Sequence, residues 1–193
     1  MEWNRLQDDR LALITELVSR ACGGYLGRTA LMKFCYLLQI VRRVPLGYRF
    51  TLYSYGPFDS GLLSDLGTAE TREAVTSSVV PYSGGYSYHI KRGRRADAVV
   101  ASGNEFLREN SESIEWVLTE FGSHSSADLE LESTIIYADR EAGRKGEKLP
   151  IPELAKRVKA VKPHFDEDYI LVKAMELFSK HLLQSSSPAL AHA

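Results

Sequence analysis

The spacing of the apolar residues changes along the chain, and this change limits which folds its 193 residues can adopt. Over residues 4–21 and 29–41, apolar side chains recur every three or four positions, which predicts two amphipathic helices. Residues 48–55 instead alternate between two faces, which predicts a half-buried strand. The chain therefore combines helices with strands in its first third.

A Gly-Pro break follows the alternating segment directly, in the stretch "LYSYGPFDSGLLSDL". Gly56 can supply the unusual backbone of a turn, and Pro57 fixes the next φ angle. Asp59 or Ser60 can then cap a helix over residues 59–67. The stretch therefore predicts a strand, a turn and a helix in close succession. Whether Tyr53 and Tyr55 lie in a core or on an interaction surface stays open at this level.

The remaining pattern completes the predicted fold. Residues 77–91 read as two short strands around a Ser-Gly-Gly turn, and the chain after about residue 102 shows only helical spacing. Pro163 should end one of these helices, and Asp166 should begin the last one. We therefore predict an α+β fold that is mostly α. It has a winged-helix-like N-terminal unit with a β-hairpin (residues 1–100), a helical C-terminal unit packed on it (101–184) and a flexible tail (185–193).

Composition indicates a cytoplasmic protein without a membrane anchor. No stretch approaches the roughly 20 consecutive apolar residues of a membrane span. The N-terminus carries early acids and lacks the pattern of a signal peptide. Cys22 and Cys35 both sit among apolar residues, which favours buried thiols in a reducing compartment over a disulfide.

The net charge of −1 hides an uneven distribution. Residues 1–100 carry 13 Lys and Arg against 9 Asp and Glu, whereas residues 101–193 carry 11 against 16. A basic hairpin could therefore lie along a phosphate backbone, or simply form a solvated loop. Candidate nucleic-acid-binding residues are Lys91, Arg92, Arg94, Arg95, Arg42 and Arg43. Against sequence-specific recognition, the helix at 59–67 has two Asp and no Arg or Lys.

The motifs of common enzymes are missing from the sequence. The five histidines show no ligand spacing, and there is no phosphate-binding glycine loop, no GxSxG elbow and no Asp-x-Lys or Glu-x-Lys pair. The acid-rich "DLELE" at 128–132 reads as a solvated helix face. We therefore predict no catalytic residue, metal or cofactor, and a protein that is not an enzyme. A hydrolase or nuclease with a site assembled from distant residues remains an alternative.

Four segments together resemble a known family. They are "GRTALMKFCYLLQ", "GYRFTLYSYGPFDSGLLSDL", "LELESTIIYA" and "ELAKRVKAVKPHF". They look like the YwgA-like proteins, which are related in pattern to the SocA-like (Panacea) domain. The resemblance covers residues 25–70 well and 129–165 more loosely, and its most specific part is the Tyr-Gly-Pro that closes the aromatic strand. The chain departs from the pattern in its "KRGRR" segment and its longer helical C-terminal part.

The resemblance implies a protein that holds a partner rather than one that turns over a substrate. SocA-like domains resemble antitoxins and protease adaptors, and no catalytic residues carry over from them. The matching positions, taken as partner-binding candidates, are Lys33, Tyr36, Tyr53, Tyr55, Gly56, Pro57 and Phe58. We therefore expect a non-enzymatic protein-binding module, antitoxin-like or part of a prokaryotic defence system. Its partner would be a toxin or a defence protein.

Besides a hydrolase or nuclease, three further possibilities stay open at this level. The first is a DNA-binding transcriptional regulator that uses the basic hairpin. The second is a homo-oligomer. The third is that the C-terminal "ALAHA" serves as a degradation signal, although an incidental alanine-rich tail is the simpler interpretation.

Overall fold

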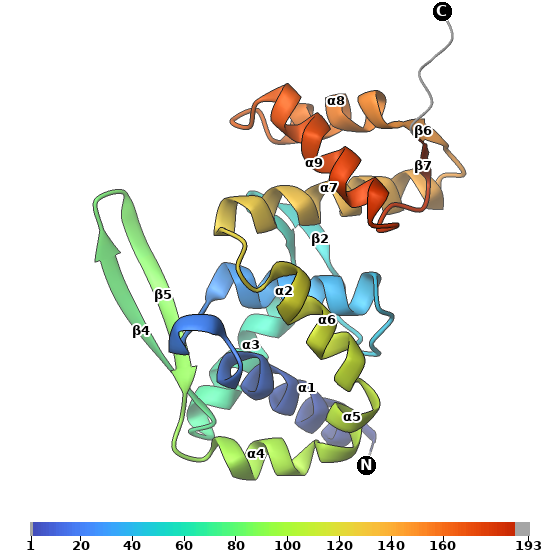
Figure 1. Ribbon diagram of the computed structural model, residues 1–193. Helices are drawn as coiled ribbons and strands as arrows, with labels where there is room; N and C mark the ends of the chain where they lie inside the picture. Colours follow the sequence, from blue (N-terminus) through green and yellow to red (C-terminus); the bar gives the residue numbers. More distant parts are fainter. Residues whose placement is uncertain (1, 188–193) are drawn as a thin grey trace, which may run out of the picture. The chain divides into compact units, whose positions relative to one another are not determined.

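The computed structural model describes residues 2–187, except for the side chains of residues 2–4 and 82 (Figure 1). It confirms an α+β fold that is mostly helical. The chain forms two compact units, each described separately below. Unit 1 comprises Met1–Thr51 and Phe58–Ser126, and unit 2 comprises Leu52–Pro57 and Ala127–Ala193.

Unit 1 is built from helices and a three-stranded sheet. Its helices are α1 (Glu2–Ser19), α2 (Arg28–Ile40), α3 (Ser60–Thr71), α4 (Ala96–Ser102), α5 (Asn104–Glu109) and α6 (Ser111–Phe121), with a short 3-10 turn, η1 (Cys22–Gly24). The sheet is antiparallel, in the order β1 (Leu26–Gly27), β5 (Gly85–Arg92), β4 (Val75–Tyr82). The predicted hairpin is therefore confirmed. The winged-helix-like character of the N-terminal unit remains a prediction.

The boundary between the units differs from the predicted one at residue 100. Helices α4 and α5 pack on α1, and α6 packs on α2, so all three belong to unit 1. Their apolar side chains explain this, because Phe106, Ile114 and Val117 are buried. Helical spacing alone cannot show which neighbour an apolar face will contact.

Unit 1 buries its apolar faces as the spacing predicts, with one exception among the cysteines. Leu17 of α1, Leu31 of α2 and Ile90 of β5 are all 0% exposed. Cys35 is buried as expected, but Cys22 is exposed, and neither cysteine forms a disulfide. Cys22 lies in η1 directly before two glycines with positive φ, so the chain turns there instead of continuing the helix.

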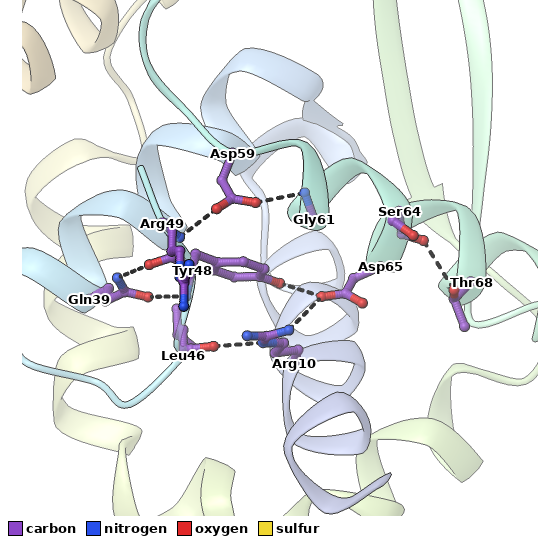
Figure 2. Close-up of polar contacts among 10 residues, drawn as sticks. All are labelled: Arg10, Gln39, Leu46, Tyr48, Arg49, Asp59, Gly61, Ser64, Asp65 and Thr68. Carbon is purple, nitrogen blue, oxygen red and sulfur yellow. Dashed lines mark hydrogen bonds and ion pairs between the residues drawn. The ribbon is translucent and has the colours of Figure 1, made fainter. Parts of the chain in front are cut away.

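A network of polar contacts fixes the segment around Tyr48 (Figure 2). The side-chain amide of Gln39 donates to the backbone carbonyl of Tyr48 at 2.8 Å and accepts from its backbone N–H at 2.9 Å. The backbone of residue 48 is thus paired with a side chain and belongs to no strand. The predicted strand over 48–55 is therefore shorter, and only β2 (Thr51–Tyr53) forms.

The same network reaches helices α1 and α3. The Tyr48 hydroxyl donates to Asp65 at 2.9 Å, and Arg10 lies 3.6 Å from the same carboxylate. Asp59 caps α3 as predicted, accepting from the Gly61 N–H at 2.6 Å. These contacts are drawn in Figure 2 and hold the start of α3 in place.

Unit 2 is helical apart from short strands. It contains α7 (Ser126–Arg144), α8 (Ile151–Val161), α9 (Glu167–Ser179), the hairpin of β2 and β3 (Gly56–Phe58), and the parallel pair β6 (Leu149–Pro150) and β7 (Ser186–Ser187). Helix α8 ends before Pro163, and Asp166 caps α9, both as the sequence predicts. None of the helices in the described part of the chain is long and apolar enough to cross a membrane.

The first residues of the predicted flexible tail are among those that the structure describes. Ser186 and Ser187 pair with β6, so the beginning of the predicted 185–193 tail is ordered in unit 2. The "ALAHA" segment lies outside the described residues.

Candidate functional site

The candidate site is the turn between β2 and β3, which carries two exposed tyrosines. Tyr53 is 66% exposed and Tyr55 is 71% exposed, and they flank Ser54. Gly56 follows with φ +86°, a left-handed conformation that glycine adopts without steric cost. The local sequence therefore explains the shape of the turn. We call residues Tyr53, Ser54 and Tyr55 the tyrosine turn.

A buried lysine holds the tyrosine turn from within unit 2. Lys162 is 1% exposed, and its ammonium donates to the backbone carbonyl of Ser54. The same ammonium donates to the carboxylate of Glu130 at 2.7 Å, and Glu130 is itself 6% exposed. An isolated buried charge is costly, so the ion pair and the carbonyl together make this position of Lys162 tenable. The turn is thereby fixed to α7 and to the end of α8.

His164 approaches the same carboxylate from the exposed side. Its Nε2 lies 3.4 Å from Oε1 of Glu130, while its side chain is 59% exposed. The ammonium of Lys159 donates to the carbonyls of Pro163 and Phe165, at 3.1 and 2.6 Å, and so braces the loop after α8. The loop that supplies Lys162 and His164 is therefore itself held by hydrogen bonds.

Nothing in this arrangement identifies a catalytic centre. Within residues 2–187, no group of three or more His, Cys, Asp or Glu side chains is placed to hold a metal ion. Two cavities are lined by residues of unit 1. The larger is an open groove of about 520 Å³ beside Trp116 and Arg20, and the smaller, of about 40 Å³, lies beside Tyr25. Neither of these two cavities is lined by Tyr53 or Tyr55.

The structure divides the predicted partner-binding residues between surface and interior. Lys33 is 2% exposed and Tyr36 is 1% exposed, because α2 is buried on all sides from Leu31 to Leu38. These two residues therefore belong to the core and not to the predicted contact surface. Tyr36 packs edge-on against Phe50, with ring centroids 5.2 Å apart.

The residues after the turn are also largely covered. Gly56 and Pro57 are buried, and Phe58 is half-buried. The well-exposed members of the predicted set are thus Tyr53 and Tyr55.

The predicted basic cluster is already engaged in ion pairs. Arg94 makes a two-pronged contact with Glu73, and Arg92 pairs with Asp97. Hydrogen bonding from Arg94 lowers the pKa of Glu73 below its usual range. Lys91 and Arg95 are exposed. The positive field of this cluster is therefore weaker than four cations in five residues suggest.

The other two predicted cations lie at the end of α2. The Arg42 guanidinium lies 5.3 Å from the ring centre of Trp116, in a cation–π contact. Arg43 adopts a left-handed backbone with φ +59°.

The sequence did not identify Glu130 or Lys162 as site residues. The prediction of a solvated helix face for the acid-rich segment 128–132 was wrong. Glu130 and Glu132 are buried instead of solvated, and Lys173 lies 3.2 Å from Glu132. The ion-pair partners are 32 and 41 residues away in the sequence. No local pattern could therefore have paired them.

Comparison with known proteins does not assign the chain to a family. No family model matches it, and no curated protein matches it. The resemblance to YwgA-like proteins therefore stays a prediction.

Proposed function

We propose that this protein is a non-enzymatic protein-binding module and that the tyrosine turn is the centre of its contact surface. The observation that carries the proposal is the exposure of Tyr53 and Tyr55 on a turn held by the buried Lys162. Tyrosine is enriched at protein interfaces, because its ring adds contact area while its hydroxyl tolerates water. Two such residues side by side are typical of an interface hot spot.

The rigidity of the turn supports the same proposal. A contact loop that is already ordered loses less conformational entropy when its partner binds. The carbonyl of Ser54 lies between the two tyrosines, so its bond to Lys162 restricts both of their backbones. This is an arrangement suited to binding.

The resemblance to SocA-like domains supports a toxin or a defence protein as the partner, as an antitoxin-like role would require. The alternative, a DNA-binding regulator acting through its basic hairpin, is supported less well. Arg92 and Arg94 are occupied by carboxylates, which would have to be displaced by phosphates.

The proposal is tested by affinity isolation of the tagged full chain from its native cells, with and without nuclease. We expect a stoichiometric protein that survives nuclease and is lost from the double variant Tyr53→Ser/Tyr55→Ser. The matched control is Tyr86→Ser, because Tyr86 is 74% exposed on a different hairpin. All variants should keep the melting temperature of the natural chain.

A partner that binds the double variant as well as the natural chain would contradict the proposal. A bound fraction that disappears with nuclease would instead support the DNA-binding alternative.

A further inference from the structure

The three-stranded sheet of unit 1 packs one face on the core around Leu26, Val75 and Ile90. Ile90 of β5 is 0% exposed and faces the core. Because side chains alternate along a strand, His89 and Lys91 lie on the opposite face. Ser78 and Thr76 of β4 are their respective cross-strand neighbours. We call this the outer sheet face.

A stacked pair of rings lies on the outer sheet face. The rings of Tyr25 and His89 are parallel to within 13°, with centroids 3.7 Å apart. Tyr25 precedes β1, whose Gly27 is paired with His89, so the rings come from neighbouring strands. Tyr25 remains 39% exposed. Stacking on His89 therefore orders the Tyr25 ring while part of this side chain stays open to solvent.

The charged side chains within the sheet itself are basic. Strands β1, β4 and β5 contain no Asp or Glu, and Lys91 is exposed. The neighbouring carboxylates, Glu73 and Asp97, are held by Arg94 and Arg92. The hydroxyls of Thr76 and Ser78 lie on the same exposed face. Cations, hydroxyls and flat rings are the groups that contact phosphates and stack on bases.

We propose that the outer sheet face binds single-stranded nucleic acid, with a base stacked on Tyr25 and a phosphate bound by Lys91. A single strand fits because its bases can leave their own stack, whereas those of a duplex are covered by their neighbours. The site shares no residue with the tyrosine turn. It differs from the predicted cation cluster because it relies on stacking and uses only Lys91 of that cluster.

The test is fluorescence anisotropy of the full chain with labelled oligo(dT) and oligo(U), and with an oligo(dA)·oligo(dT) duplex, at low salt. Tyr25→Ala should weaken binding of the single strands about ten-fold or more, whereas Tyr25→Phe should bind as the natural chain does. Lys91→Ala should lower the slope of log K against log salt by about 0.7. Lys156→Ala, an exposed lysine of α8, should leave that slope unchanged.

The face assignment has its own control. Tyr86 lies on the same strand as His89 but on the opposite face, so Tyr86→Ala should not weaken binding. Equal effects of Tyr86→Ala and Tyr25→Ala would overturn the proposal, as would a preference for the duplex or no binding of any oligonucleotide. Circular dichroism and melting curves check that each variant is folded.

Discussion

The buried ammonium of Lys162 hydrogen-bonds to the backbone carbonyl of Ser54, 108 residues earlier in the chain. This bond joins the loop after α8 to the turn that presents Tyr53 and Tyr55. Because the same ammonium is paired with Glu130, the charge is neutralised where water is excluded. The turn that carries the exposed tyrosines is thus held by a buried ion pair.

Replacement of Lys162 should reveal how strongly unit 2 depends on this ion pair. Lys162→Met keeps the length of the side chain but leaves Glu130 buried without its cation, so we expect the free energy of unfolding to fall by about 3–5 kcal/mol. The measurement is urea denaturation. In the double variant Lys162→Met/Glu130→Leu, much of the loss should be recovered.

The control for this experiment is Lys156→Met on the same helix. Lys156 pairs with Glu153 at the surface, where solvent screens the two charges, so its replacement should change the free energy of unfolding far less. Similar losses for the two lysine variants would contradict the assigned role of Lys162.

The thiols should differ sharply in reactivity. Cys22 is exposed, whereas Cys35 is fully buried and burial raises the pKa of its thiol above the usual range. We therefore expect an aromatic disulfide reagent to modify Cys22 rapidly in the folded protein and Cys35 only after unfolding. Cys22→Ser should abolish the rapid reaction. Rapid modification of the Cys22→Ser variant under native conditions would show that the helix carrying Cys35 opens readily.

Tyr48 should make the stability of the protein sensitive to alkaline pH. Burial raises the pKa of its hydroxyl, and the neighbouring Cys35 and Asp65 raise it further. The folded state therefore keeps the proton, while the unfolded chain releases it near its usual pKa of about 10. The stabilisation is complete below that pH and declines as the pH rises above it.

The measurement is denaturant unfolding at a series of pH values between neutral and about 11. Tyr48→Phe should lower the stability at neutral pH by about 1–3 kcal/mol, because Asp65 loses its donor, and should flatten the alkaline decline. Tyr55→Phe alters an exposed tyrosine and should leave the profile unchanged. An unaltered alkaline decline in Tyr48→Phe would assign the decline to other groups.

Asp139 should control the order of the last described residues of the chain. Its carboxylate is 0% exposed and accepts from the backbone N–H groups of Gln184 and Ser185, at 2.8 and 3.0 Å, and from the Ser186 hydroxyl at 2.9 Å. In Asp139→Ala, these donors lose their acceptor, so the amide hydrogens of Gln184 and Ser185 should exchange at least about ten-fold faster.

Hydrogen exchange followed by mass spectrometry measures this effect over residues 182–187. The matched control is Glu141→Ala, which removes a carboxylate of the same helix that pairs with Arg144. Unchanged exchange in the Asp139 variant would show that the β6–β7 pairing is sufficient to order the segment.

Local signals account for the parts of the fold that were predicted correctly. The caps at Asp59 and Asp166, the end of α8 before Pro163 and the β4–β5 hairpin each depend on residues within a few positions of one another. The Gly56 turn belongs to the same group, since a positive φ is a requirement of that one residue. The candidate contact residues Tyr53 and Tyr55 could be named because strict alternation assigns them to one face.

Tertiary structure decided what those local elements contact. It buried Lys33 and Tyr36, joined α4, α5 and α6 to unit 1, and paired Glu130 with Lys162. The physical reason is that a helix face or a charge has no local preference among distant partners. The sequence by itself therefore determined the elements, their caps and the tyrosine pair, while only the packed chain determined which of the candidate residues reach the surface and what holds them there.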